Sequence, residues 1–175
     1  MTPEESDQIE AIRRGTPVVM SLRMKTSDSE QSYNFYIYES SVMAERVNPD
    51  GTDDHIMVAT DDLPEHLADL LDPLHTAGEH REVGRFATMD DFADQAAQFP
   101  VLAETVVLSM LTLADKRTDL ARACVVYASP HAVAILDGGP TLTTPDTPYV
   151  LSEASRDDVL DAVNHLIAGV PLPSD

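Results

Sequence analysis

The stretch "RACVVYASPHAVAILDGG", residues 122–139, predicts a β-hairpin and with it the character of the fold. Two runs of small, aliphatic and β-branched residues, about 122–128 and 131–137, flank a Ser-Pro dipeptide. The single cysteine of the chain, Cys124, lies inside the first run. We therefore expect two strands whose side chains pack in a core rather than the start of a thiol active site.

Four more strands are predicted before this hairpin. The segments 17–27 and 32–39 alternate apolar and polar residues, which is typical of strands with one buried face. Two shorter strands are predicted at 41–47 and 55–60, separated by a loop in which Asp50-Gly51 is a turn signal. The run reads as an antiparallel meander, and a last short strand is expected at 149–152.

Helices are predicted where capping residues precede apolar stripes. Thr2, Pro3 and Glu5 start the first helix with a capping box. Asp62 and Glu65 are expected to do the same for a Leu-striped helix that ends near Leu71. Near the C-terminus, Ser155 and Asp158 are expected to form a capping box at the start of a helix over residues 156–169.

The middle of the chain is predicted to be helical. Thr88 and Asp91 start one helix, and the apolar segment 101–116 is expected to form a second, centrally buried one. The linker 75–86 has no assigned structure, and residues 138–148 form a long loop.

These elements predict a single α+β domain over residues 1–175. Its mainly antiparallel sheet is expected to be built from two similar β-meander-plus-helix units, with a helical pair between them. The units lie at about 16–76 and 120–170, and the bridging helices at about 88–117.

The net charge of the chain limits the kinds of partner that we expect. The chain has 31 acidic and 11 basic residues, a formal net charge of −20. Such a surface repels phosphate backbones and anionic lipid head groups, so nucleic acid and membrane are not expected as partners. A lone cysteine, an acidic N-terminal start and the lack of an apolar run long enough to span a bilayer lead us to expect a cytoplasmic protein.

Thiol chemistry is not expected. A catalytic cysteine needs a lowered pKa and some exposure, whereas Cys124 has Ala123, Val125 and Val126 as neighbours in a strand. We expect Cys124 to be a small buried apolar residue. His131 follows a proline at the hairpin tip and is expected to be exposed.

The histidines do not form a metal-binding motif. Zinc usually takes three or four ligands at tight spacing, and the sequence offers only His75, Glu79 and His80 in one short segment. His66 and His165 lie at similar places in the two predicted units, and the sixth histidine is His55. We expect no metal site and no cofactor.

The aspartates have structural explanations. Asp50, Asp53 and Asp54 lie in a hairpin loop that lacks the alternating ligands and distal glutamate of an EF-hand. The pairs Asp61-Asp62 and Asp157-Asp158 lie at helix N-termini, where acids stabilise the helix dipole. Ser152 and Ser155 have no nucleophile elbow around them. We therefore expect no catalytic residue.

Two segments together carry a resemblance to a known family. The stretches "SYNFYIYESSVMAERVNPDGTDDHIMVATDDLPEHLADLL" and "ACVVYASPHAVAILDGGPTLTTPDTPYVLSEASRDDVLDAVNHLI" resemble, in their order of strand, turn and helix, the EspG-like chaperones of type VII secretion. This chain is shorter, has little of the family's N-terminal helical part and is more acidic. The resemblance implies a cytoplasmic, non-enzymatic protein that keeps a secreted helical partner soluble, and it assigns no individual residue.

The favoured hypothesis is thus a non-catalytic protein-binding module, such as a secretion chaperone or adaptor, whose partner-binding residues are unknown. Two alternatives stay open. One is a small-ligand-binding or enzymatic domain with a site assembled from scattered residues, with the linker 75–86 and the loop 138–148 as lids. The other is a structural or regulatory subunit that forms a homodimer. A deep polar pocket favours the first alternative, and a shallow apolar patch favours the binding module.

Overall fold

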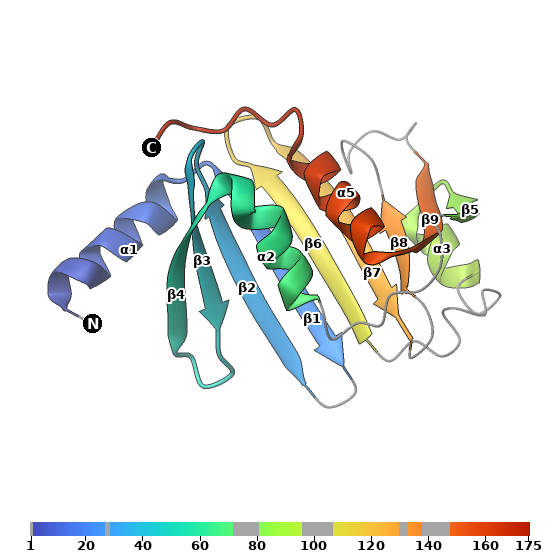
Figure 1. Cartoon of the computed structure of the whole chain (residues 1–175), viewed down its shortest axis with the longest axis horizontal. Coiled ribbons are helices and arrows are strands. Elements are labelled where there is room, and N and C mark those ends of the chain that lie inside the picture. Colours follow the sequence, from blue (N-terminus) through green and yellow to red (C-terminus); the bar gives the residue numbers. More distant parts are fainter. Residues whose placement is uncertain (1, 27–28, 72–80, 96–106, 130–132, 138–147) are drawn as a thin grey trace.

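The computed structural model describes residues 2–26, 29–71, 81–95, 107–129, 133–137 and 148–175. Within these ranges, nine strands form one sheet in the order β4-β3-β2-β1-β6-β7-β8-β9-β5, and every neighbouring pair is antiparallel (Figure 1). The strands are β1 (Val18–Thr26), β2 (Glu30–Ile37), β3 (Ser41–Val47), β4 (Asp53–Ala59), β5 (Arg81–Phe86), β6 (Val107–Asp115), β7 (Leu120–Ala128), β8 (Val133–Asp137) and β9 (Tyr149–Ala154).

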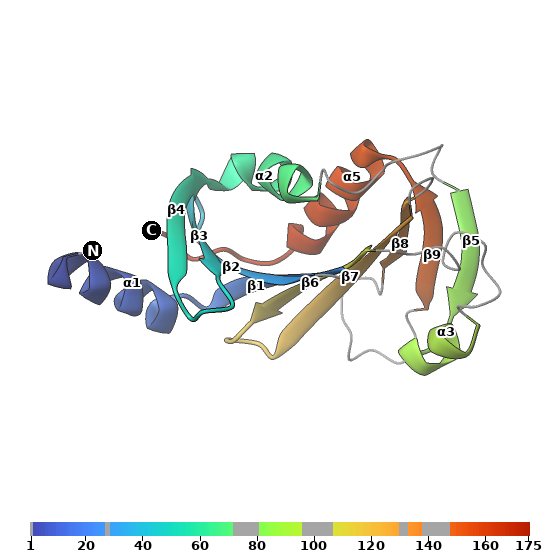
Figure 2. The ribbon, with the colours of Figure 1, turned by 90° about the horizontal axis from the view of Figure 1, so that it is seen from below.

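Helices lie on both sides of this sheet. Helices α2 (Leu63–Leu70) and α5 (Arg156–Ile167) cover one face, whereas α1 (Pro3–Gly15) and α3 (Met89–Gln95) lie on the opposite side at its two ends (Figure 2). The predicted α+β class with a mainly antiparallel sheet is therefore confirmed. Among the described helices, none has the length and apolar character needed to cross a bilayer.

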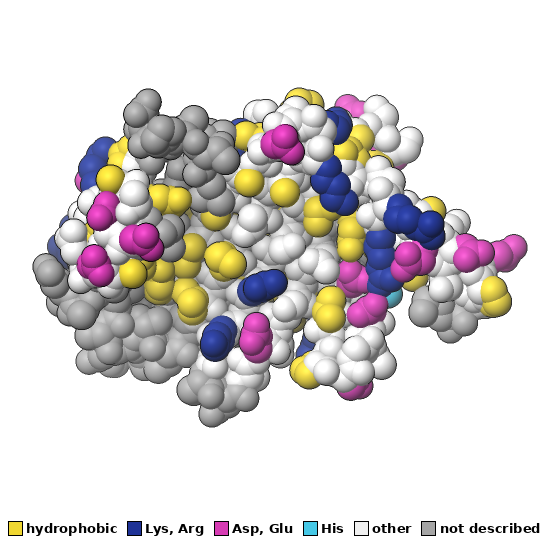
Figure 3. All heavy atoms as spheres, turned by 180° about the vertical axis from the view of Figure 1, so that it is seen from behind, with side chains coloured by type: hydrophobic (Ala, Val, Ile, Leu, Met, Phe, Trp, Pro, Cys, Tyr) yellow, Lys and Arg dark blue, Asp and Glu magenta, His cyan; other side chains and the backbone are white. Residues whose placement is uncertain are grey.

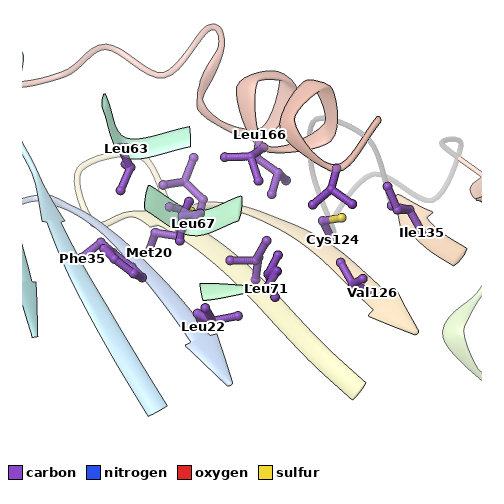
Figure 4. Close-up of a cluster of buried hydrophobic side chains, with 14 of the residues drawn as sticks. Met20, Leu22, Phe35, Leu63, Leu67, Leu71, Cys124, Val126, Ile135 and Leu166 are labelled. Carbon is purple, nitrogen blue, oxygen red and sulfur yellow. The ribbon is translucent and has the colours of Figure 1, made fainter. Parts of the chain in front are cut away.

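The main core lies between the sheet and the helices α2 and α5. Alternate residues of the strands point into it, among them Met20 and Phe35, and Leu67 and Leu166 meet them from the helices (Figure 4). All four side chains are almost completely buried. Burying a side chain of this size contributes about 1.5–3 kcal/mol, so the layered packing supplies most of the driving force for this fold.

Two of the three predicted capping boxes are present. The side chains of Thr2 and Ser155 accept hydrogen bonds from the backbone of Glu5 and Asp158, whose carboxylates accept in return. The cap expected at Asp62 is wrong, because residues 60–62 form a 3₁₀ helix that runs directly into α2. Asp62 therefore has helical backbone angles (φ −89°, ψ −7°) and its side chain makes no capping bond.

The largest correction concerns the predicted central helix at 101–116. Residues Val107–Asp115 form the strand β6, at the centre of the sheet between β1 and β7. Both faces of this strand carry large apolar side chains: Leu111 and Leu113 in the core, and Leu108 and Met110 on the other face. This pattern hides the two-residue period that identifies a strand with one polar face. Residues 101–106 lie outside the described part.

The second helix of the predicted pair is thus wrong over residues 107–115, and the only described bridging helix is α3. It starts as expected, with the Asp91 backbone N–H donating to Thr88 Oγ1. The linker 75–86, to which no structure had been assigned, contains the edge strand β5. The described sheet therefore joins a four-strand run, β1–β4, to a second run, β6–β9, through the pair β1–β6.

A buried arginine fixes the end of α5 to this second run. Arg122 of β7 is 8% exposed, and its Nη1 donates to the carbonyl oxygens of His165, Leu166 and Ala168 at the C-terminus of the helix. Helix carbonyls at this end have no partner within the helix, so the cation satisfies them and also matches the negative end of the dipole.

Candidate functional site

Among the residues that the structure describes, helices cover the two ends of the sheet face opposite α2 and α5 and leave its middle open. Leu108 and Met110 of β6 point to this face and are 36% and 38% exposed. Figure 3 views the molecule from this side and shows apolar side chains gathered across its centre. Exposed apolar side chains that lie together on a sheet mark a surface suited to binding a partner.

Basic residues of the neighbouring strand flank these side chains. In the register of β1 with β6, Arg23 lies opposite Met110 and Lys25 lies opposite Leu108, and both basic residues are exposed. We call these four residues the open strip. Its local charge is positive, although the whole chain carries −20.

At the β5 end, aromatic side chains cover the same face. Phe92 of α3 packs edge-on against Phe86 of β5, with ring centroids 5.3 Å apart, and its ring lies 5.2 Å from that of Tyr127. Both phenylalanines are almost fully buried. Burial raises the pKa of Tyr127 to about 12, so its hydroxyl stays neutral. This end of the face is therefore a second, smaller core rather than a free surface.

At the β4 end, a polar cluster holds α1 against the sheet. Arg13, at the end of α1, donates to Glu45 Oε1 through Nε at 2.9 Å and through Nη2, and Nη2 also reaches Asp53 Oδ2 at 2.7 Å. His55 Nε2 lies 3.2 Å from Glu45 Oε1. Asn34 and Tyr36 of β2 donate to the other oxygen, Glu45 Oε2, each at 3.2 Å.

The cluster stabilises the ionised form of Glu45. Burial by itself would raise the pKa of this carboxyl, but hydrogen bonds from Arg13, Asn34 and His55 outweigh burial and lower the pKa. Burial and the negative charge of Glu45 raise the pKa of Tyr36 to about 12. The hydrogen bond to Glu45 raises the pKa of Arg13, which therefore remains a cation.

Three side chains of this cluster have the chemistry of metal ligands. The ligand atoms of Glu45, Asp53 and His55 all lie within 4.8 Å of one another. The Arg13 guanidinium contacts each of them, with His55 Nε2 at 3.3 Å from Nη2. A cation thus already lies among these three groups, and the arrangement as it stands is an anchor for α1.

The residues that were considered as reactive groups, and predicted not to be, lie as follows. Cys124 is 1% exposed, in the core beneath α5, so its predicted burial is confirmed (Figure 4). Burial and the nearby Asp137 carboxylate raise the pKa of its thiol, which keeps it protonated and unreactive. Ser152 is buried on β9, and Ser155 serves as the α5 cap. His131 lies outside the described residues.

The three described histidines lie in separate places. His55 belongs to the Glu45 cluster, half-buried His66 packs edge-on against Phe35 with ring centroids 6.2 Å apart, and His165 is exposed on α5. His75, Glu79 and His80 lie outside the described residues. The prediction that these three residues form no metal site therefore stays untested.

The aspartates mostly have the structural roles expected of them. Asp50 Oδ1 accepts from the backbone N–H and hydroxyl of Thr52 and shapes the turn, in which Gly51 takes a positive φ of 84°. Asp158 completes the α5 capping box. Asp53 is the exception, because it binds Arg13 across 40 residues of sequence.

Several surface hollows accompany these clusters. One of about 440 Å³ lies between α5 and the strands β8 and β9, and its lining includes Asp137, Ser152, Asp161 and His165. Another of about 440 Å³ lies between α2 and α5. A groove of about 430 Å³ separates α1 from β4, and a hollow of about 250 Å³ lies between α2 and the strands β2–β4.

No protein-family model matches the chain, and no curated protein matches its sequence. Among solved structures, the chain is similar to the type VII secretion system chaperone EspG5 of Mycobacterium tuberculosis, solved in complex with a PE25–PPE41 dimer. The TM-score is 0.68, the identity is 11%, and the match covers 100% of this chain and 81% of that one. The likeness expected from the order of strands and helices therefore holds for the fold, and at this identity it shows the fold alone.

Proposed function

We propose that this protein is a non-catalytic module that binds another protein through the open strip, as a chaperone or adaptor does. The observation that carries the proposal is the exposure of Leu108 and Met110 at the centre of a sheet face whose two ends are covered. The likeness to a secretion chaperone agrees with this role.

The open strip also indicates the chemistry of the partner. Full burial of one large apolar side chain contributes about 1.5–3 kcal/mol, so Leu108 and Met110 can anchor a partner that covers them. Arg23 and Lys25 lie beside them and favour a partner with carboxylates next to its own apolar side chains. We propose a secreted helical protein as this partner, as the resemblance to type VII secretion chaperones implies. The similar structure, which was solved in complex with a PE25–PPE41 dimer, agrees with a protein partner.

Two potentially reactive groups among the described residues agree with a non-enzymatic role. The Cys124 thiol is buried and held neutral, and the Glu45 carboxylate already accepts hydrogen bonds from Arg13, Asn34 and Tyr36. Each group has a packing or anchoring role in the described structure. The predicted location in the cytoplasm belongs to the same proposal.

We also propose that the sheet consists of two equivalent units, which diverged from one another. Strands β1–β4 lead into α2 and strands β6–β9 lead into α5, both helices lie on the same face, and the central pair β1–β6 joins the two runs. The second run includes β6, so its unit starts at about residue 107 rather than 120.

The two alternatives have different observable signatures. The hollow beside α5, with buried Ser152 and the carboxylates of Asp137 and Asp161, is the feature that favours a small-ligand domain. Isothermal titration with small cationic amines tests it, and the Asp161→Asn variant serves as the control. Sedimentation of the purified chain tests the homodimer.

The test of the proposed function is co-purification from an extract of the native host. Tagged wild-type protein is expected to retain one stoichiometric partner, identified by mass spectrometry, and Met110→Asp is expected to lose it. Asn164→Asp on α5 is the control, since Asn164 is exposed and lies on the opposite side of the sheet from the open strip. Absence of a stoichiometric partner, or equal retention by Met110→Asp, contradicts the proposal.

A further inference from the structure

Strand β4 forms an open edge of the sheet with an unusual surface. Its seven residues pair with β3 in an unbroken register, from Val47 opposite Asp53 to Ser41 opposite Ala59. Among the described strands, none pairs with its other side. Ile56 and Met57 are 50% and 60% exposed on opposite faces of this edge. A regular edge strand with exposed apolar residues is a template for pairing with another chain.

Hollows lie on both sides of this edge. On the α2 face, the hollow of about 250 Å³ has a mixed lining that includes Glu45, Arg46 and Asp54 beside its apolar residues. On the other face, the groove of about 430 Å³ is walled by α1. Ile56 lines both of them. The other apolar or aromatic lining residues are Tyr33, Ala44, His66 and Leu70 for the first, and Ile9, Ile12, Met43 and Met57 for the second.

We propose that β4 binds an extended segment of another protein as an additional strand of the sheet. In an added strand, successive side chains point to opposite faces. One set would therefore enter the hollow beside α2 and the other would enter the groove beside α1. Backbone hydrogen bonds to β4 supply affinity in this mode, and the two hollows select apolar side chains.

The charges around the β4 edge indicate which residues flank the apolar centre of the bound segment. The rim of the α1 groove carries Glu5, Asp53 and Asp54, of which Asp53 is paired with Arg13. The lining of the hollow beside α2 includes Asp54 and Arg46. The segment that fits this edge therefore has lysine or arginine next to its apolar residues.

A second copy of this chain fits the edge poorly. Acids lie on both sides of the strand, with Asp53 and Asp54 at its start and Asp61 and Asp62 just after it. A two-fold pairing of β4 with β4 brings the first pair of one copy close to the second pair of the other. Like charges at such positions destabilise strand pairing.

This edge is distinct from the open strip and the inference does not depend on the proposed function. The open strip lies on the face of β1 and β6 and is locally basic, whereas the edge belongs to β4 and is acidic. A partner that binds one surface need not contact the other. A negative binding result at one surface therefore does not contradict the proposal for the other surface.

The test uses the full chain and a fluorescent, end-blocked peptide of about nine residues, long enough to pair along one strand. Its centre carries valine and isoleucine and its ends carry lysine. Fluorescence anisotropy is expected to show saturable binding, which weakens at least tenfold when alternate backbone nitrogens are methylated or when glutamate replaces lysine. Hydrogen exchange of the amides in residues 53–59 is expected to slow when the peptide is added.

Variants locate the site. Ile56→Asp is expected to weaken peptide binding at least tenfold, because Ile56 lines both hollows, and Met110→Asp is expected to bind like wild type. Circular dichroism verifies that both variants fold. The proposal is overturned by no binding at peptide concentrations up to about 1 mM, by equal binding of the methylated peptide, or by unchanged exchange in residues 53–59. A dimer of the protein alone that Ile56→Asp abolishes would assign the edge to a second copy and also overturn it.

Discussion

Strand β5 closes one edge of the sheet with charged side chains and a bulge, whereas β4 leaves the other edge regular, with exposed apolar residues at its centre. The register of β5 with β9 shifts between Glu82 and Gly84, and its exposed Arg81 and Arg85 pair with Glu153 and Glu82. Bulges and charges are the devices by which sheets avoid pairing with other chains. The edge of β4 has Asp53 and Asp54 at its start but exposes Ile56 and Met57 at its centre.

The two ends of the sheet also differ in how a helix is attached next to the edge strand. At the β5 end, α3 and three aromatic rings fill the face, so the end is held by apolar packing. At the β4 end, α1 buries no residue and is attached through Arg13 to a carboxylate cluster. The β5 end of the sheet is therefore closed by packing, whereas the β4 end combines a stabilising anchor with an accessible surface.

The largest effect is expected from removing the aromatic cover at the β5 end. Phe92→Ala should lower the free energy of unfolding by about 3–5 kcal/mol, because it deletes a buried ring that contacts Phe86 and Tyr127. Urea denaturation followed by circular dichroism measures this loss. Asp94→Ala, at an exposed position of the same helix, is the control and should change stability little. A loss under about 1 kcal/mol would mean that the rings do not pack as described.

The next effect concerns the polar anchor at the β4 end. Arg13→Met should cost about 2 kcal/mol, because it leaves the buried Glu45 carboxylate without its main cationic partner while Asn34 and Tyr36 still donate to it. Arg14→Met is the matched control, since the Arg14 side chain is 79% exposed and its Nε lies 3.8 Å from Glu10. Equal stability of the two variants in urea denaturation would argue against the anchor.

A smaller, pH-dependent effect follows from the same cluster. The folded state lowers the pKa of Glu45, so the stability gained from its ionisation is complete above the ordinary value of 4.5. That contribution is lost as the pH falls through the lowered pKa of the folded state. The difference in unfolding free energy between wild type and Arg13→Met should therefore shrink as the pH is lowered from 6 to 3. A difference that stays constant or grows over this range would contradict the assignment.

Local patterns in the sequence predicted much of this structure. The alternation in 17–27 and 32–39 identified β1 and β2, and the serine and threonine caps identified the starts of α1 and α5. These signals depend on neighbours within a few residues, so they can be recognised from the sequence alone. The central strand β6 could not be recognised in this way, because both of its faces are apolar.

The polar cluster depended on contacts that a sequence does not show. Arg13 and Glu45 lie 32 residues apart, and Asp53 was assigned to the turn because its neighbours are turn residues. One local signal did exist: Glu45 lies in a strand that is otherwise largely buried, and a buried acid requires a cation or donors nearby. The exposed residues of β4 gave no signal at all, because "HIMVAT" has the composition of an ordinary strand until its position at an edge is known.

The smallest effect on stability is expected from placing charged residues on β4, like those that protect β5. This change tests the difference between the two edges most directly. The double variant Ile56→Lys/Met57→Glu should change the free energy of unfolding by less than about 0.5 kcal/mol, because both side chains are at least half exposed. It should nevertheless abolish binding of the lysine-flanked peptide and reduce aggregation on heating, as followed by light scattering. The reciprocal variant Arg85→Val removes a charge from the bulged edge, and it should leave peptide binding as it is, because the bulge still interrupts pairing along β5. New peptide binding by Arg85→Val would show that charge alone, and not the bulge, distinguishes the two edges.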